Sequence, residues 1–273
     1  MQDLFAELND LMVRYHFRPQ KKLSQNFLLD EKIIELMVDS ASLSPSDTAL
    51  EIGCGTGFLT RKILEKCRAI GVEFDAPLIE LLKNEVKSES FTLLEGDFLS
   101  LEIPSFNKIV SSPPYAISSE IMFRLFSLKF ELAVLLFQEE FADKLLAQPG
   151  FRKYNALTVA CNYFCDCKMI KKVNAGSFFP KPPSESCILK LEWKKSKEQA
   201  KNDPQFIEFL KEVFRLKNKN FSNALQNSLP FLNKKIEFNE KEVAGKLSSL
   251  EFAHEKVYLL ECNDFVKAFN ELF

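Results

Sequence analysis

The strongest constraint on the fold is a glycine-rich turn that joins an apolar run to an amphipathic segment. In L-E-I-G-C-G-T-G-F-L, the residues Gly53, Gly55 and Gly57 follow directly on the apolar run Thr48–Ile52. Glycines at such a turn let the backbone bend tightly and approach a nucleotide-like ligand, because no Cβ stands in the way. The stretch predicts a buried strand, a ligand-binding turn and a helix in succession.

Short apolar runs alternate with helix-period segments from residue 48 onward, which is typical of a doubly wound α/β sheet. The later runs Asp166–Val173 and Cys187–Trp193 are joined by a long connection with Gly and Pro, as in an antiparallel pair. We therefore expect a mostly parallel Rossmann-like sheet whose last strand is antiparallel. The other expected strands are Thr48–Ile52, Ala69–Glu73, Phe91–Glu95, Asn107–Ser111 and Leu132–Phe137, and the expected helices are Thr56–Cys67, Ala76–Val86, Ser118–Ser127 and Glu139–Ala147.

A charged stretch after Trp193, K-K-S-K-E-Q-A-K-N-D-P, has no apolar period and is typical of a linker. Beyond it the pattern is helical only. We place a domain boundary near residue 197, with a cofactor-binding domain at 1–197 and a small all-helical domain at 198–273. Its expected helices are Pro204–Leu216, Phe221–Ser228, Glu240–Leu250 and Asp264–Leu272.

Composition excludes several classes of protein. No apolar run reaches the roughly 18 to 20 residues of a bilayer span. The first residues contain three acids and predict an amphipathic helix with Leu4, Leu8, Leu11 and Tyr15 on one side, not a signal peptide. The seven cysteines are scattered and only two histidines are present, which predicts reduced thiols, a cytoplasmic protein and no metal site.

The net charge of −2 gives no global attraction for nucleic acid, so any such partner depends on local basic patches. Two candidates are the stretch R-Y-H-F-R-P-Q-K-K, which ends at Lys21 and Lys22, and the stretch K-E-V-F-R-L-K-N-K, which contains Arg215, Lys217 and Lys219. A cluster of like charges is also typical of a solvated face. Each patch therefore needs support from other features.

Acidic residues lie at or near the ends of the first three expected strands. Glu51 lies two residues before the first glycine, Glu73 ends the second strand in G-V-E-F-D, and Asp97 follows the third in E-G-D-F. The carboxyl ends of parallel strands meet at one edge, so Glu73 is placed to accept hydrogen bonds from ribose hydroxyls and Asp97 from an adenine amine. Such acids also cap helices. The spacing G-x-G-x-G, in place of G-x-G-x-x-G, favours S-adenosylmethionine over a dinucleotide.

The motif Ser112-Pro113-Pro114-Tyr115 ends the fourth expected strand. An exocyclic amine of a nucleobase is a poor nucleophile, because its lone pair is delocalised into the ring. The Ser112 hydroxyl and the Pro113 carbonyl can hold its hydrogens and aim the lone pair at a methyl sulfonium, while the prolines fix the backbone. Tyr115 can stack on an extruded base. In isolation the motif also fits a simple turn, but beside the glycine loop it indicates amino-methylation.

At these residues the sequence resembles the ribosomal small-subunit adenine dimethyltransferases, the bacterial KsgA type with its archaeal and eukaryotic counterparts, which are relatives of the erythromycin-resistance methylases. K-K-L-S-Q-N-F-L-L-D is similar to the family's K-x-x-G-Q-N-F-L-x-D, and S-P-P-Y to its N-L-P-Y or N-P-P-Y. P-G-F-R-K-Y-N-A-L-T-V resembles P-G-x-x-x-Y-G-x-L-S-V, and F-F-P-K-P-P-S-E-S resembles F-x-P-x-P-K-V-x-S. F-R-L-K-N-K-N-F-S-N-A-L is similar to F-x-x-R-N-K-x-x-x-x-A-L and, with Lys256-Val257-Tyr258, leans toward the archaeal and eukaryotic branch.

The resemblance implies a class I methyltransferase fold and S-adenosylmethionine-dependent dimethylation of the N6 amines of two adjacent adenosines near the 3′ end of small-subunit rRNA. The implied partner is that rRNA within a pre-ribosomal small subunit, and we expect a monomer. The implied catalytic residues are Ser112, Pro113 and Tyr115. The implied cofactor contacts are Asn26, Leu28, Gly53, Gly55, Glu73, Asp97 and Ser112. The implied substrate contacts are Tyr115, Phe178 (facing the target base), Lys21, Lys22, Arg215, Lys217 and Lys219.

Three positions depart from the family pattern: Ser112 stands for Asn, Ser24 for Gly and Asn155 for Gly. A serine has one oxygen where asparagine has an amide, which makes the second methylation more demanding. Two alternatives stay open. DNA amino-methyltransferases also use S-P-P-Y, although their target-recognition regions are usually larger than the region after residue 197. A non-catalytic RNA-binding assembly factor is favoured by Ser112 and opposed by the cofactor residues.

Overall fold

The computed structural model describes residues 3–195 and 198–273, and the chain divides into two compact units. Unit 1 comprises Met1–Ala142 and Cys167–Trp193, and unit 2 comprises Asp143–Asp166 and Lys194–Phe273. The domain boundary that we expected at residue 197 lies outside the described residues. Each unit is described below by itself.

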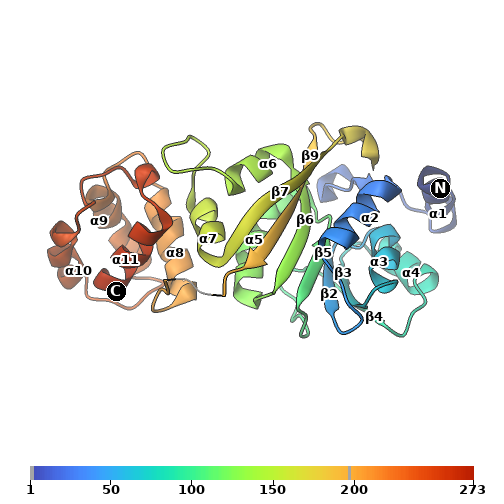
Figure 1. Ribbon diagram of the computed structural model, residues 1–273, viewed down its shortest axis with the longest axis horizontal. Coiled ribbons are helices and arrows are strands. Elements are labelled where there is room, and N and C mark those ends of the chain that lie inside the picture. Colours follow the sequence, from blue (N-terminus) through green and yellow to red (C-terminus); the bar gives the residue numbers. More distant parts are fainter. Residues whose placement is uncertain (1–2, 196–197) are drawn as a thin grey trace. The chain divides into compact units, whose positions relative to one another are not determined.

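Unit 1 contains a seven-stranded sheet with the order β4-β3-β2-β5-β6-β9-β7 (Figure 1). The pairs β2–β3, β2–β5, β3–β4 and β5–β6 are parallel, and β9 pairs antiparallel with β6. The predicted mostly parallel sheet with an antiparallel last strand is confirmed. The strands are β2 (Thr48–Ile52), β3 (Arg68–Glu73), β4 (Phe91–Glu95), β5 (Lys108–Ser111), β6 (Leu132–Gln138), β7 (Cys165–Val173) and β9 (Ser186–Trp193).

Two features of unit 1 have no counterpart in the expected elements. The short strands β1 (Phe27–Leu28) and β8 (Phe178–Phe179) pair antiparallel, which ties the segment before α2 to the segment before β9. Helix α2 follows β1, and the Asp30 side chain caps it by accepting a hydrogen bond from the Ile33 N–H. The helices of unit 1 are α1 (Leu4–Arg14), α2 (Glu31–Ser40), α3 (Phe58–Leu64), α4 (Ala76–Glu85), α5 (Ser118–Leu128) and α6 (Glu139–Leu145), the last of which runs to the start of unit 2.

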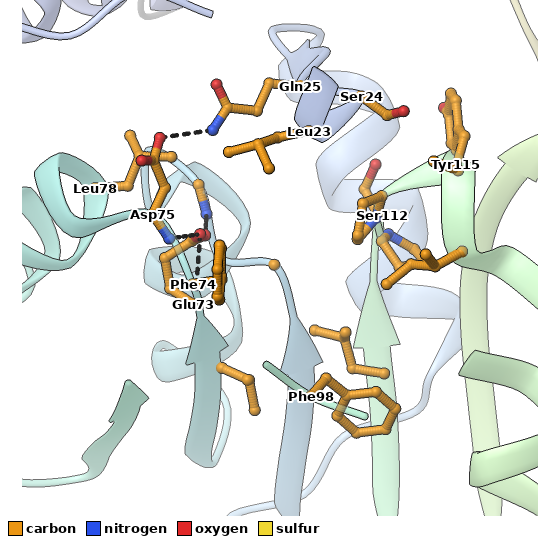
Figure 2. Close-up of a pocket in the computed structure, with 18 of the residues that line it drawn as sticks. Leu23, Ser24, Gln25, Glu73, Phe74, Asp75, Leu78, Phe98, Ser112 and Tyr115 are labelled. Atoms are coloured by element: carbon orange, nitrogen blue, oxygen red, sulfur yellow. Dashed lines mark hydrogen bonds between the residues drawn. The ribbon is translucent and has the colours of Figure 1, made fainter. Parts of the chain in front are cut away.

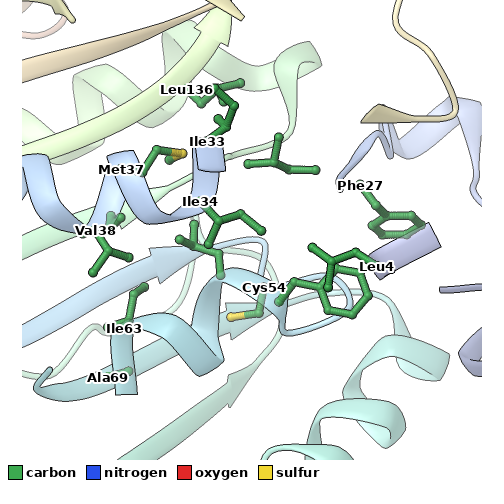
Figure 3. Close-up of a cluster of buried hydrophobic side chains, with 14 of the residues drawn as sticks. Leu4, Phe27, Ile33, Ile34, Met37, Val38, Cys54, Ile63, Ala69 and Leu136 are labelled. Atoms are coloured by element: carbon green, nitrogen blue, oxygen red, sulfur yellow. The ribbon is translucent and has the colours of Figure 1, made fainter. Parts of the chain in front are cut away.

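A continuous apolar core joins α1 to α4 with one face of the sheet (Figure 3). Leu4, Leu8 and Leu11 of α1 are buried, which confirms the predicted amphipathic helix, whereas Tyr15 caps its end and is half-buried. Ile34 and Met37 of α2 are at most 1% exposed. This burial of apolar side chains holds α1 and α2 against the sheet that carries the glycine loop.

Unit 2 is helical and is built around aromatic rings. Its helices are α7 (Ala156–Phe164), α8 (Asp203–Phe214), α9 (Phe221–Leu232), α10 (Glu240–Lys246) and α11 (Cys262–Leu272). Phe206, Phe209, Phe221, Phe265 and Phe269 are each at most 1% exposed and contact one another at centroid distances of 5.5 to 6.3 Å. Among the described residues, no helix is long and apolar enough to cross a membrane.

Segment 143–166 comes before most of β7 and before β9 in the chain, yet it belongs to unit 2 because its helix α7 packs against α8 and α11. The Tyr163 ring lies 4.8 Å from that of Phe206, and the Tyr154 hydroxyl donates to the Leu260 carbonyl over 2.8 Å. Our division by chain order did not anticipate this. A short segment buried almost throughout, as α7 is, has no amphipathic period that marks it as a helix.

Close packing beneath the glycine loop gives a test of the fold. A Cβ at Gly71 in β3 would lie 2.5 Å from Cys54 Sγ and 2.7 Å from the Phe91 ring. We expect Gly71→Ala to lower the free energy of unfolding by about 1 to 3 kcal/mol through overpacking. Guanidinium unfolding followed by Trp fluorescence measures this in unit 1, because Trp193 is the only tryptophan.

The matched control is Gly245→Ala in α10, where an added Cβ meets nothing within 4 Å. Alanine is the better helix former by roughly 0.5 to 1 kcal/mol, so this variant should be as stable as the wild type or more stable, as followed by circular dichroism. A Gly71→Ala protein with wild-type stability would contradict the packing described here.

Candidate active site

The carboxyl ends of the central parallel strands border one pocket in unit 1 (Figure 2). Five segments line it: the arm at residues 22–27, the glycine loop after β2, the residues after β3, residues 96–98 after β4, and residues 112–117 after β5. These are the segments that carry the sequence motifs. The sheet order explains their meeting, because β3, β2 and β5 are adjacent and parallel.

The glycine loop is held in a conformation that other residues rarely adopt. Gly53, Gly55 and Gly57 have φ angles of 75°, 56° and 78°. A Cβ at Gly53 would lie 3.3 Å from Pro114, and a Cβ at Gly55 would lie 3.2 Å from the Phe27 ring. The loop is therefore packed between the N-terminal arm and the Pro-Pro motif, and the absence of side chains lets the three segments approach.

Glu73 is the central polar group of the pocket. Its carboxylate accepts the Gly55 N–H over 2.8 Å at one oxygen, and the Phe74 and Asp75 N–H groups over 2.8 and 3.0 Å at the other. Burial raises the pKa of Glu73, and the three backbone hydrogen bonds oppose the rise. The carboxylate links the glycine loop after β2 to the turn after β3, as Figure 2 shows.

Asp75 is a second buried acid of the pocket, and no role was predicted for it from its sequence context. Its carboxylate accepts the Gln25 side-chain amide over 2.8 Å and the Gln20 amide over 3.3 Å, and the Gln25 oxygen in turn accepts the Gln20 backbone N–H over 2.7 Å. These bonds fasten the arm to the start of α4. Gln25 belongs to the Q-N-F-L stretch that the sequence analysis singled out. Its partner Asp75 is fifty residues away, so the sequence pattern did not reveal the pairing.

Asp97 and two phenylalanines lie around the same pocket. Asp97 is exposed, and one of its oxygens accepts the Leu99 N–H over 2.9 Å. The Phe74 ring is 63% exposed although it follows a buried strand, while Phe98 is buried. The exposed Phe74 ring, which lies between Glu73 and Asp75 in the chain, offers a flat apolar surface beside hydrogen-bond acceptors. Such a surface suits a purine nucleoside.

Glu51 does not belong to the pocket, so its expected place beside Glu73 and Asp97 is wrong. It is 2% exposed and accepts the Thr60 hydroxyl of α3 over 2.6 Å. Adjacent residues of a strand point to opposite faces of the sheet. Ile52 therefore lines the pocket, whereas its neighbour Glu51 points to the other face and contacts α3. Burial raises the pKa of Glu51 to about 8, and the nearby Glu73 charge adds to the rise.

The Ser112-Pro113-Pro114-Tyr115 motif follows β5 and borders the pocket. The Ser111 hydroxyl bridges to β2, donating to the Ile52 carbonyl over 2.8 Å and accepting the Ile52 N–H over 3.2 Å. In the part of the chain that the structure describes, no hydrogen bond is made by the Ser112 hydroxyl, and Figure 2 shows it directed into the pocket. Its oxygen is therefore available to a ligand.

Tyr115 is held by a residue that the sequence reasoning missed. Its hydroxyl lies 2.9 Å from the hydroxyl of Ser186, a fully buried residue at the start of β9. Burial raises the pKa of Tyr115, so the phenol stays neutral. Ser186 is the last letter of the F-F-P-K-P-P-S-E-S stretch, and only the fold brings it to Tyr115.

Two apolar residues that we expected to contact the cofactor or the target base do not line the pocket. Leu28 and Phe178 are paired in the β1–β8 ladder, are 8% and 4% exposed, and belong to the apolar core. The neighbouring Phe27 lines the pocket in their place, while Asn26 lines it as expected and donates its side-chain amide to the Ser24 carbonyl. A ligand role for Leu28 and Phe178 stays a prediction.

The expected basic contacts differ in availability. Lys21 and Lys22 are exposed in the short 3-10 helix Lys21–Leu23, and Lys22 lines the pocket. In unit 2, Lys219 is exposed and Arg215 pairs with Glu212 over 2.9 Å. Lys217 is engaged in the fold, because its ammonium donates to the Arg152 and Tyr154 carbonyls. Lys217 thus holds a loop in place of presenting a charge to a ligand.

The groups that line the pocket fit S-adenosylmethionine. The glycine loop allows close approach, the carboxylates of Glu73 and Asp97 can accept hydrogen bonds, and the exposed Phe74 ring offers an apolar surface. Among the described residues, no cluster of three or more His, Cys, Asp or Glu side chains suits a metal ion.

Comparison with known proteins gives consistent matches over most of the chain. Residues 16–260 match the family model described as ribosomal RNA adenine dimethylase. A probable ribosomal RNA small subunit methyltransferase A of Thermococcus gammatolerans is 35% identical, with 93% of this chain and 89% of that protein covered. The protein of the same description from Methanopyrus kandleri is 37% identical, with 79% of each covered.

Solved structures agree with these matches. A dimethyladenosine transferase from Plasmodium falciparum has a TM-score of 0.76 and 31% identity, with 89% of this chain and 95% of that chain covered. The 23S rRNA methyltransferase ErmE has a TM-score of 0.64 and 23% identity, with 90% and 99% covered, and supports the likeness of the fold.

The burial of Glu51 makes stability depend on pH. Its pKa is about 8 in the folded protein and near 4.5 in the unfolded chain. Between these values the folded state keeps a proton that the unfolded chain has released, so the free energy of unfolding should fall as the pH rises from about 5 through 8. Glu51→Gln should reduce the difference between urea unfolding at pH 6 and at pH 9, with the exposed Glu89→Gln as control. An unchanged difference would contradict the assignment.

Proposed function

Because the chain belongs to the ribosomal RNA adenine dimethylase family, we propose that it transfers methyl groups from S-adenosylmethionine to the N6 amines of adenines in small-subunit rRNA. The observation that carries the proposal is the position of Ser112-Pro113-Pro114-Tyr115, which borders the same pocket as Glu73 and Asp97. A methyl donor and a base amine can thus meet at one strand end.

The cofactor residues act by shape and by accepting hydrogen bonds. When bound, S-adenosylmethionine supplies an electrophilic methyl group on a sulfonium. A carboxylate has about four lone-pair sites. Because Glu73 uses three of them for backbone N–H groups, it keeps capacity for a ribose hydroxyl. Asp97 has an exposed carboxylate for the adenine amine, and Phe74 an exposed ring for its face.

The strand end after β5 acts on the target amine. The Ser112 hydroxyl and the Pro113 carbonyl accept the two amine hydrogens, which leaves the nitrogen lone pair directed away from the ring. As the nitrogen gains the methyl group, the bond between that carbon and the sulfonium sulfur would break to leave a neutral thioether. The nitrogen then releases a proton to water, so no strong general base is needed. The Tyr115 ring, fixed through its hydroxyl to Ser186, offers a stacking surface for the extruded base.

The finer features follow from the family. We propose two adjacent adenosines near the 3′ end of the rRNA as targets, each dimethylated, in a small-subunit precursor in the cytoplasm, and a monomeric enzyme. Ser112 bears most on the second methyl group, because a monomethylated amine has a single hydrogen left to hold. The same serine is the feature that favours a non-catalytic assembly factor, and the test below separates the two.

Incubation with labelled S-adenosylmethionine and unmethylated small subunits tests the proposal. We expect label in the rRNA and primer-extension stops at two adjacent adenines near its 3′ end. Label in duplex DNA with none in rRNA would favour a DNA amino-methyltransferase. If the protein does not bind S-adenosylmethionine, the enzyme proposal is excluded and the non-catalytic assembly factor remains.

Tyr115→Ala serves as the control variant in the same assay. It removes the stacking ring, worth about 1 to 3 kcal/mol, and leaves Glu73 and Asp97 in place, so transfer should drop about 10-fold or more while cofactor affinity stays unchanged. Ser186→Ala should lower transfer in the same sense and less strongly. Wild-type transfer by Tyr115→Ala would contradict the proposed role.

A further inference from the structure

Three segments of unit 2 form one surface around the loop between α6 and α7. The Gly150 N–H donates to the Tyr258 carbonyl over 2.8 Å, and the Tyr258 N–H donates to the Lys217 carbonyl over 3.2 Å. The Lys217 ammonium donates back to the loop at the Arg152 and Tyr154 carbonyls over 2.7 and 3.1 Å. The loop is thus tied on both sides to the rest of unit 2.

This framework presents a phenylalanine to solvent. Phe151 is 65% exposed and Leu259 is 44% exposed, although the backbone on either side of Phe151 is hydrogen-bonded within the loop. A Cβ at Gly150, whose φ is +87°, would lie 3.8 Å from Leu259, so the two exposed apolar side chains belong to neighbouring segments. A rigid loop that holds an aromatic ring in water is suited to binding a partner.

Basic residues lie on the same three segments that meet at this loop. Residues 148–154, 216–220 and 255–260 contain five basic residues and one acid, Glu255, in a chain whose net charge is −2. Arg152, Lys219 and Lys256 are exposed, and the described residues give them no ion pair. Lys256 lies 6.0 Å from the Tyr258 ring. By contrast, Lys235 on the same unit is bound by Glu208 and Glu212.

We propose that Phe151, Arg152, Lys219, Lys256, Tyr258 and Leu259, called the Phe151 surface, bind single-stranded rRNA. An unpaired base stacks on the Phe151 ring, and phosphates pair with the three cations. The inference rests on the proposed function and names the part of unit 2 that holds the substrate. Lys217 was an expected rRNA contact, but its ammonium is bonded to the Arg152 and Tyr154 carbonyls. Arg152 and Lys256, which were not predicted as contacts, take its place in the proposed surface.

RNA fits this surface better than a protein partner does. The centres of protein interfaces are depleted in charged residues other than arginine, whereas two of the three cations here are lysines, and Lys256 lies 6.0 Å from the Tyr258 ring. Cations interleaved with aromatic rings are typical of single-stranded nucleic-acid binding.

Equilibrium binding of the full chain to unmethylated small subunits and to protein-free small-subunit rRNA, at several salt concentrations, tests the inference. We expect Phe151→Ala to weaken both affinities about 10-fold, the scale of one lost base stack. The double variant Lys219→Ala with Lys256→Ala should lower the slope of log K against log salt by roughly 0.7 for each lost phosphate contact. Cofactor affinity and thermal unfolding should stay at wild-type values.

The controls are Val13→Ala, a 72% exposed side chain on α1, and Lys246→Ala, a lysine of unit 2 paired with Glu242. Both should bind like the wild type.

Wild-type binding by Phe151→Ala would overturn the inference. A loss seen with whole subunits but not with protein-free rRNA would also overturn it, in favour of a protein partner. If the wild type binds rRNA through Phe151 and transfers no methyl group, the proposed function fails and this surface stands. Wild-type protein without rRNA binding would overturn both.

Discussion

The buried carboxylate of Glu73 organises the pocket, because it joins the ends of two strands through backbone groups. It accepts N–H groups from the glycine loop after β2 and from its own turn after β3. A carboxylate in this place is costly to bury and is stabilised by these hydrogen bonds. The glycine loop, the adjacent Asp75 and the arm that Asp75 fastens are all positioned around it.

The same strand order places the reaction motif. Strand β5 lies beside β2, and Ser111 bridges the two strands at their carboxyl ends, so Ser112 follows at the rim of the pocket. Tyr115 is fixed from the opposite direction, through Ser186 of the antiparallel strand β9. The parallel strands thus supply the acids that border the pocket, and the antiparallel strand β9 holds the Tyr115 ring through Ser186.

Periodicity and glycine spacing predicted β2 and β4 to the residue, the class of the sheet and the family, since these depend on local pattern. The pairing of Asp75 with Gln25 and of Tyr115 with Ser186 escaped prediction because the partners are 50 and 71 residues apart. Glu51 was misplaced because a neighbouring glycine loop does not show which face of the strand a side chain takes. Lys217 looked like a free cation because a sequence does not show which carbonyl groups lie within reach.

We propose that the strand-end pocket binds the methyl donor through Glu73. Titration calorimetry with S-adenosylhomocysteine on the wild type and on Glu73→Gln tests it most directly, with circular dichroism to verify folding. We expect saturable binding at one site per chain in the wild type and an affinity at least 10-fold lower in the variant, because the amide replaces an accepting oxygen by a donor. Equal affinity in the folded variant, or no binding by the wild type, would contradict it.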